Sequence, residues 1–353
     1  MSLVVVKTEV DLSNLDKNVS DALKELNFEI KDNDIITIKP NLCDYRPSEQ
    51  GGTTDPLVVE AVIKYIRTLS NCPINIVESD HALAIADDEF ERMGYLYLEK
   101  EYENVKVINL TKEKHHRLYL GGFYFDEFSA PEVLLKTTKL VNVAKLKTHT
   151  QTKITCILKN QFGLVSRRYK KRYHPFLSEV ILDLIKLFPP TLSIIDGLVA
   201  MEGSGPSDGD RRDSKILICG NDPVTTDIIA ARVMGIKPLT VPVIKLAKKK
   251  KVSNLKYNLI GTLPKLKFKH MPWYSYLMRR YGLNSHKRAA RKYAKKKKRS
   301  EFYSDVAAGF LVLKQGNYST LQSGLIDRQI FFRVFKGMLK RPFVRIKLKL
   351  KGI

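Results

Sequence analysis

Strand-like and helix-like segments alternate through residues 1–240, and this alternation limits the chain to a few architectures. Short apolar or β-branched runs typical of strands lie at residues 35–42, 74–80, 105–110, 139–147, 192–198 and 215–220. Patterns with helical spacing lie between some of them, at residues 56–68, 176–188 and 223–234. Repeated alternation of this kind predicts an α/β fold, with a mainly parallel sheet and flanking helices.

Two of the expected helices carry start signals in the sequence. Pro56 suits the first position of a helix, with Thr54 or Asp55 as its cap. Asp222 stands in the same relation to Pro223, so we expect it to cap the helix over 223–234.

The positive charge of the chain is unevenly divided along its length. The formal net charge is +24, from 61 Lys and Arg against 37 Asp and Glu. Residues 1–240 hold 31 basic and 34 acidic side chains, whereas residues 241–353 hold 30 basic and only three acidic ones. We therefore expect an α/β core over residues 1–250 and a strongly basic, aromatic-containing C-terminal module, itself α/β or helical, over residues 251–353.

The basic module predicts an anionic partner. Residues 269–282 and 327–341 place bulky apolar or aromatic side chains beside Lys and Arg, which is typical of helices lying on an anionic membrane surface. Nucleic acid or another polyanion is the alternative partner, with Trp273 and Tyr274 among the side chains suited to base stacking. A third interpretation is that these faces pack on the α/β core.

Cysteine usage and the lack of targeting signals predict the compartment. The four cysteines, at positions 43, 72, 156 and 219, form no CxxC pair, which argues against zinc ribbons and fits a reducing cytoplasm. The first residues show no basic segment followed by a long apolar stretch, so we expect no signal peptide. No apolar run approaches the length of about 18 residues that a spanning helix needs. We expect a cytoplasmic protein, peripheral at the inner face of the membrane.

Polar residues cluster directly after the predicted strands. These clusters lie at residues 38–41, 77–80, 144–149, 195–209 and 220–223. In open parallel sheets ligands bind beyond the carboxyl ends of the strands, because the loops converge there. The sequence therefore predicts one composite pocket at that edge.

The residue types in these clusters indicate an anion site. Lys39, Lys145, Lys147 and Lys159 are expected to neutralise phosphate or carboxylate groups. The glycine-containing turn after the fifth strand adds Gly203 and Gly205, where backbone N–H groups can approach an anion closely. A simple connecting loop is the other interpretation of that turn.

Acids and histidines in the same segments suggest roles in chemistry. Asp196 and Glu202 are candidate ligands of a divalent metal, and Glu202 is also a candidate base. His149 is the candidate proton-transfer group and joins Lys147 and Glu202 as an expected catalytic residue, while His174 is a second histidine for the pocket. Helix capping, loop solvation and ordinary surface histidines are the alternatives for each of them.

Several blocks of sequence occur together in a known order. They are KPNL (39–42), TTDPLVVEAVI (53–63), AKLKTHTQTKITCILKNQFGLV (144–165), YHPF (173–176), IIDGLVAMEGSGPSDG (194–209) and NDPVTTDIIAARVMG (221–235). Over about residues 35–250 the chain thereby resembles the prokaryotic domain-of-unknown-function family 362.

The resemblance implies an α/β domain and a set of polar site residues. The family pattern falls on Lys39, Asn41, Thr53, Thr54, Lys147, His149, Lys159, Asn160, His174, Asp196, Glu202, Gly203, Gly205, Pro206 and Asp222. Many members carry a ferredoxin-like module with four-cysteine motifs, which implies redox work. This chain lacks such a motif, so we expect no iron–sulfur cluster in it.

Two hypotheses of function follow. In the first, the protein is an enzyme acting on a small anionic metabolite in a Lys/Asp/Glu/His pocket, with the basic module holding it at an anionic membrane. In the second, it is a non-catalytic protein that binds nucleic acid or another polyanion through residues 251–353.

Overall fold

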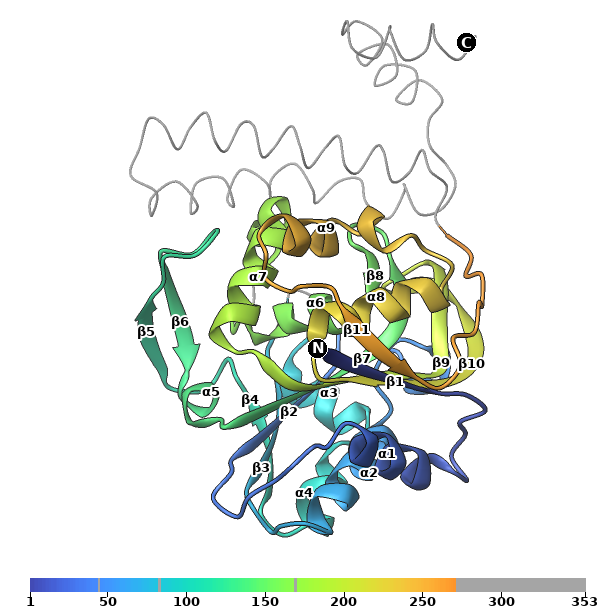
Figure 1. The fold of residues 1–353 in the computed structure, drawn as a ribbon. Coiled ribbons are helices and arrows are strands. Elements are labelled where there is room, and N and C mark those ends of the chain that lie inside the picture. The colour runs from blue at the N-terminus through green and yellow to red at the C-terminus, as the bar shows by residue number, and fades with distance from the viewer. Residues whose placement is uncertain (44, 82–83, 168–169, 271–353) are drawn as a thin grey trace, which may run out of the picture. The chain divides into compact units, whose positions relative to one another are not determined.

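The computed structural model describes residues 1–43, 45–81, 84–167 and 170–270 (Figure 1). The expected basic module is thus described only as far as residue 270. The interfacial helix expected over 327–341 and nearly all of the segment 269–282 lie outside the described residues.

A nine-stranded mixed sheet runs through the described part, in the order β11-β1-β10-β9-β7-β2-β3-β4, with β8 paired to β7. Its strands are β1 (Ser2–Lys7), β2 (Ile36–Pro40), β3 (Ile74–Glu78), β4 (Val105–Asn109), β7 (Lys139–His149), β8 (Lys153–Thr155), β9 (Pro190–Ser204), β10 (Asp208–Gly220) and β11 (Tyr257–Ile260). A separate two-stranded sheet pairs β5 (His115–Tyr119) with β6 (Glu127–Pro131). The neighbours from β9 through β7, β2 and β3 to β4 are all parallel.

Helices cover both faces of the large sheet (Figure 1). They are α1 (Leu15–Glu25), α2 (Pro56–Arg67), α3 (Ala86–Arg92), α4 (Leu96–Glu101), α5 (Glu132–Lys136), α6 (Ile157–Asn160), α7 (Leu177–Leu187), α8 (Pro223–Val233) and α9 (Pro242–Lys249). Four short 3₁₀ helices span Ser48–Gln50, Gln161–Leu164, Lys170–Phe176 and Pro238–Thr240. One hydrophobic core lies between the sheet and α1 to α4, and a second lies between the sheet and α6 to α9.

This architecture confirms the α/β fold expected from the alternation of apolar runs. All six expected strands and all three expected helices are present. The boundaries are close to those predicted except in β9 and β10, which are much longer than the expected runs 192–198 and 215–220. Asp55 caps α2 by accepting a hydrogen bond from Leu57 N at 2.9 Å, and Asp222 caps α8 through Thr225 N at 2.7 Å.

Two polar clusters do not lie where the sequence pattern placed them. Residues 195–209, expected to form a loop, continue the strand β9 and turn into β10 as a long hairpin. Because β10 runs antiparallel to β9, it ends beside the start of β9, with Gly220 opposite Ser193. The 220–223 cluster and Asp222 are therefore at the other edge of the sheet, away from the carboxyl ends of the parallel strands.

The sheet also takes in chain from beyond residue 250. The strand β11 pairs in parallel with β1, so that Val4 lies opposite Leu259. Farther along, Leu266 N and Phe268 N donate to the carbonyl oxygens of Val233 and Met234, at the end of α8. Among the described helices, none is both long enough and apolar enough to cross a membrane.

Candidate functional site

Four lysines gather at the carboxyl edge of the parallel strands: Lys39, Lys147, Lys159 and Lys170. We call them the lysine cluster. The positive charges of Lys147 and Lys39 act on Lys159, and those of Lys39 and Lys159 act on Lys170. The structure therefore brings together three of the four lysines singled out in the sequence and adds Lys170, whereas Lys145 forms an ion pair with Asp196.

Two of these lysines, Lys39 and Lys147, lie on strands and come from opposite faces of the sheet. Lys39 lies opposite Asn142 in the register between β2 and β7. Because successive side chains of a strand point to opposite faces, Lys39 shares a face with Asn142, whereas Lys147 belongs to the other face. The two side chains can approach one another only at the end of the sheet, where β2 stops at Pro40 and leaves the edge open.

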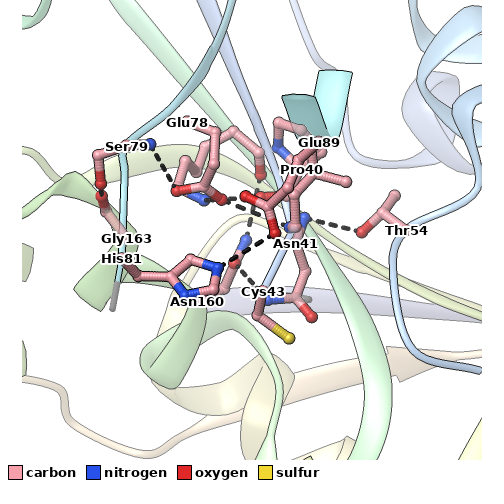
Figure 2. Close-up of polar contacts among 12 residues, drawn as sticks. Pro40, Asn41, Cys43, Thr54, Glu78, Ser79, His81, Glu89, Asn160 and Gly163 are labelled. Carbon is pink, nitrogen blue, oxygen red and sulfur yellow. Dashed lines mark hydrogen bonds and ion pairs between the residues drawn. The ribbon is translucent and has the colours of Figure 1, made fainter. Parts of the chain in front are cut away.

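Lys39 is held by a carboxylate of the neighbouring strand. Its Nζ lies 2.5 Å from Glu78 Oε2 and donates to Pro40 O at 2.7 Å, while the other carboxylate oxygen accepts from Ser79 N at 2.8 Å. The side chains of Lys39 and Glu78 are 0% and 3% exposed. Figure 2 shows Glu78 and Ser79 on one side of the site and Asn41 on the other.

Lys147 has a different environment, in which no carboxylate of the described residues lies within ion-pair distance. Its Nζ donates to Gly52 O at 2.5 Å and lies 3.0 Å from the sulfur of Cys43. The ammonium group is buried, whereas Cys43 is half-buried. An ammonium group this close to a thiol favours the thiolate form of the cysteine.

Lys159 and Lys170 also lack a carboxylate within ion-pair distance in the described part of the chain. The Nζ of Lys159 lies 5.0 Å from the centre of the Phe162 ring, and that of Lys170 donates to Ser79 Oγ at 2.7 Å. Burial is the largest of the causes that lower the pKa of each of these two lysines to about 8. The neighbouring lysines also lower the pKa, and Glu78 acts in the opposite direction on both. Both amines therefore exchange protons close to neutral pH.

A buried acid outside the cluster fixes the position of Lys159. Asp227 of α8 accepts hydrogen bonds from Ile157 N at 2.8 Å and Leu158 N at 3.1 Å, at the start of α6. Burial raises the pKa of Asp227 to about 7, although both backbone N–H groups favour the charged carboxylate. The short helix α6 carries Lys159 and Asn160 and is oriented by this contact.

Four side-chain amides form a chain of hydrogen bonds beneath the lysines. Asn160 Nδ2 donates to Asn142 Oδ1 at 2.8 Å and to Lys39 O at 3.1 Å, and its Oδ1 accepts from Asn41 Nδ2 at 3.0 Å. Asn142 Nδ2 in turn donates to Gln161 Oε1 at 2.8 Å. The Oδ1 of Asn41 has no hydrogen-bond partner among the described residues, although Asn41 is only 6% exposed.

The two threonines expected in the site, Thr53 and Thr54, make hydrogen bonds to backbone groups around it. Thr54 Oγ1 donates to Val143 O at 2.9 Å and accepts from Asn41 N at the same distance, which ties the end of β2 to β7. Thr53 Oγ1 donates to Arg46 O at 2.9 Å. Thr53 also lines a surface pocket of about 400 Å³, to which no lysine of the cluster contributes.

A histidine–glutamate pair beside the cluster gave no signal in the sequence. His81 Nε2 lies 3.1 Å from Glu89 Oε1, and both side chains appear in Figure 2 near Glu78. Glu89 is fully buried, and this burial raises its pKa. It lies in an acidic run at the start of α3, where a solvated face is the ordinary expectation.

Asp196 lies in the sheet as an internal ion pair. Its Oδ2 lies 2.8 Å from Lys145 Nζ and accepts from Asp55 N at 2.9 Å, while Oδ1 accepts from Leu198 N at 3.1 Å. Burial raises its pKa and Lys145 opposes that rise. Both oxygens therefore already have partners within the protein.

Glu202 lies apart from the lysine cluster. Its carboxylate accepts from Arg212 at 2.7 Å and from Lys269 N at 3.0 Å, which fastens the segment after β11 to the hairpin. In register, Met201 lies opposite Lys147, so Glu202 points to the opposite face of the sheet. Asp196 and Glu202 therefore cannot bind one ion together.

The two glycines of the expected anion-binding turn have structural contacts. Gly203 N donates to Lys269 O at 2.9 Å, and Gly205 O accepts from Thr150 N at 3.0 Å. A Cβ on Gly205 would collide with the carbonyl group of Thr148, so this position requires glycine for a close approach of two backbones.

The two expected histidines lie at the turn after β7. His149 Nδ1 accepts from Gln151 N at 2.9 Å and from Thr152 N at 3.2 Å, which leaves Nε2 as the protonated nitrogen. His174 lies against Phe162, with ring centres 5.9 Å apart, and its carbonyl oxygen accepts from Gln151 Nε2. Among the described residues, no group of three or more His, Cys, Asp or Glu side chains is arranged to bind a metal ion.

Comparison with known proteins assigns this arrangement to a family. The model of the family described as domain of unknown function 362 matches residues 36–232, which is more than half of the chain and runs from β2 into α8. The chain belongs to this family. This membership confirms the resemblance found in the sequence.

A DUF362 relative and two solved structures share parts of this chain. A thylakoid-associated protein of Synechocystis sp. is 27% identical over 220 residues, which are 60% of this chain and 67% of that protein. The lactate racemase apoprotein of Thermoanaerobacterium thermosaccharolyticum aligns over 61% of this chain at 13% identity and a TM-score of 0.34. A protein from Thermotoga maritima aligns over 69% at 11% identity and the same TM-score.

The two solved structures are longer than the aligned region. The alignments span 53% and 60% of their chains. TM-scores this low do not establish a common fold, and we infer nothing about this DUF362 member from them.

Proposed function

We propose that this DUF362 protein is an enzyme that binds a small anionic metabolite, carrying a phosphate or carboxylate group, in the lysine cluster. One observation carries the proposal: Lys147, Lys159 and Lys170 gather without a carboxylate within ion-pair distance in the described part of the chain. Removing ammonium groups from water without counter-ions is unfavourable, and a bound anion offsets that cost.

The cluster offers distinct roles to its members. Lys147 and Lys159 bind the anion, while Lys39, already paired with Glu78, sets the positive potential behind them. The amides of Asn41 and Asn160 orient polar groups of the ligand. Amines with a pKa of about 8, as for Lys159 and Lys170, suit proton transfer near neutral pH, so acid–base chemistry belongs to this site.

A metal ion is not part of the proposal. Asp196 and Glu202 point to different faces of the sheet, and each has a basic side chain as its partner. His149 is likewise left out as the proton-transfer group, because its Nδ1 serves the turn after β7.

The test of this proposal is anion binding by matched variants of the full chain. Calorimetric titration with inorganic phosphate should show a site that Lys159→Met weakens about tenfold, or 1.4 kcal/mol. Lys100→Met removes the same charge from the exposed end of α4, outside the basic C-terminal region, and should leave that site unchanged. Because the basic C-terminal residues are identical in both variants, equal affinities would contradict the proposal. Native mass spectrometry after incubation with a mixture of cellular anions would then identify the compound.

We further propose that the basic residues 241–353 associate peripherally with an anionic membrane. Their 30 basic and three acidic side chains attract anionic lipid, at about 1 kcal/mol for each basic residue near the surface. The name of the Synechocystis relative, thylakoid-associated, supports a membrane partner over nucleic acid.

Flotation with liposomes tests this second proposal. We expect the full chain to float with phosphatidylglycerol vesicles at low salt, to stay behind with phosphatidylcholine vesicles, and to be released as salt rises. Binding to a random-sequence duplex in a gel shift without binding to either vesicle would assign the basic residues to nucleic acid instead.

A further inference from the structure

We propose that Cys43 is a nucleophile that attacks an electrophilic carbon of the anionic compound held by the lysine cluster. This inference rests on the proposed function, because the lysines supply the binding of the anion. It adds a covalent step and names the atom that forms the bond.

The position of Cys43 sets it apart from the other cysteines. Its sulfur lies 3.0 Å from Lys147 Nζ, and its side chain is half-buried rather than enclosed. Cys72, Cys156 and Cys219 are buried, and burial raises the pKa of Cys219 to about 12. An adjacent ammonium group stabilises the thiolate, which is the reactive form of cysteine, and partial exposure lets a reactant approach it.

A second feature points to a ligand at the same place. Asn41 precedes Cys43 by two residues, and Figure 2 shows its amide and the Cys43 side chain on the same side of the site. The amide nitrogen is used by Asn160, but Oδ1 is buried and has no hydrogen-bond partner among the described residues. A buried acceptor is normally satisfied, so this oxygen suits an N–H or O–H group of a bound compound.

The positive charges of Lys147 and Lys159 favour an anionic ligand. Because these charges lie near the sulfur, the reactive carbon must lie close to the charged group of the ligand. Lys159 interacts electrostatically with both Cys43 and Lys147, so two ammonium groups, those of Lys147 and Lys159, act on the thiol. A carboxylate or phosphate bound by Lys159 would bring an adjacent carbon toward the sulfur. Glu78, an acid whose charge acts on Lys159, forms its ion pair with Lys39.

The covalent step requires no oxidant or reductant. The reacting form of Cys43 is the thiolate, whose proton has passed to solvent, beside the ammonium group of Lys147. The sulfur lone pair forms a C–S bond, the bond from that carbon to its leaving group breaks, and the leaving group departs with both electrons of the broken bond. Lys147 remains protonated until it can give its proton to the departing group.

Alkylation rates of the native full chain test this proposal. Each cysteine is followed by peptide mass spectrometry during reaction with iodoacetamide, which is neutral, and iodoacetate, which is anionic. We expect Cys43 to react at pH 6.5 at least about tenfold faster than it does in the urea-unfolded chain, since lowering a thiol pKa by one unit increases its thiolate fraction about tenfold. We also expect the ratio of iodoacetate to iodoacetamide rates to be higher in the native chain than in the unfolded one.

Variants assign the effect to its source. Lys147→Met should return the rate at Cys43 to that of the unfolded chain at pH 6.5, and Lys100→Met should not change it. Inorganic phosphate should slow alkylation of Cys43 in the native protein. The pH profile of the unaltered chain stands on its own where Lys147→Met fails to fold.

The outcomes separate this inference from the proposed function. If phosphate binds and Lys159→Met weakens it, but Cys43 reacts with the pH profile of the unfolded chain, the nucleophile is refuted while the anion site stands. If Cys43 is fast at pH 6.5 but neither prefers iodoacetate nor is protected by phosphate, the anionic substrate is refuted and the proposed function falls with it.

Discussion

Lys39 Nζ and Glu78 Oε2 lie 2.5 Å apart at the point where two neighbouring parallel strands end, and both side chains are buried. A pair so enclosed fixes the ends of β2 and β3 relative to one another. The ion pair also prevents Lys39 from moving toward a ligand. The pair is therefore a structural support for the anion site. Its loss should lower both the free energy of unfolding and the affinity for the anion.

Removing one member of this pair should destabilise the protein strongly. Glu78→Gln leaves Lys39 as an uncompensated buried charge, which costs about 3–5 kcal/mol. The double variant Lys39→Met with Glu78→Leu should recover much of that loss, because no buried charge remains. Urea unfolding followed by circular dichroism measures the difference.

The exposed pair Lys64–Asp16, at 2.9 Å, is the matched control for that experiment. Asp16→Asn breaks an ion pair of similar length in solvent and should cost less than about 1 kcal/mol. Equal losses for Glu78→Gln and Asp16→Asn would show that burial does not govern the Lys39–Glu78 pair.

Gly163 should tolerate no side chain, because the ion pair fills the space beside it. A Cβ at this position would lie 2.6 Å from Lys39 Nζ and 2.9 Å from Glu78 Oε1. Gly163→Ala should therefore displace the pair, lower the urea midpoint and weaken phosphate binding. Gly121→Ala, where a Cβ meets nothing within 4 Å, is the control and should leave both measurements unchanged.

Asp227 should affect anion binding indirectly, because its hydrogen bonds orient α6, which carries Lys159. Asp227→Ala leaves two buried N–H groups without an acceptor and should cost about 1–3 kcal/mol for each group left unpaired. It should also weaken phosphate binding, because α6 carries Lys159. Asp222→Ala removes the cap of α8 and should cost about 1 kcal/mol without changing that affinity. Calorimetry on both variants decides whether the loss is specific to α6.

Anion binding should weaken as pH rises through about 8. Lys159 and Lys170 have pKa values of about 8 in the folded protein, below their ordinary value of 10.5, so they lose their charge in this range. Between about 8 and 10.5 the unfolded chain holds more protons, and the ligand-free protein should become more stable as pH rises. Sulfate, whose charge is constant over this range, is the probe. A flat affinity from pH 7 to 9 would contradict the shifted lysines.

The sequence was sufficient to predict most of the sheet and part of the site. Apolar runs such as 74–80 and 139–147 are continuous because both faces of a parallel strand are buried, and this signal needs no tertiary information. The strand runs 35–42 and 139–147 contain Lys39 and Lys147, and the sequence block 144–165 contains Lys159. Because ligands bind at the carboxyl ends of parallel strands, the sequence predicts all three as site residues.

Other parts of the site depend on contacts that no local pattern encodes. The direction of β10 is set by its pairing with β9, so the position of Asp222 could not be read from its own segment. Glu202 lies within the long strand β9, whose glycines are typical of a loop in the sequence. His81, Glu89 and Cys43 enter the site through long-range packing.

The pairing of β1 with β10 and β11 has a consequence for how the chain acquires its structure. Val4 lies opposite Gly220 on one side and Leu259 on the other, so both neighbours of the first strand come from far along the sequence (Figure 1). During synthesis on the ribosome, β1 emerges first and remains without either neighbour until those residues follow. Contacts of such sequence separation slow folding, so completion of the sheet is a late event and its first strand is exposed to wrong pairing meanwhile.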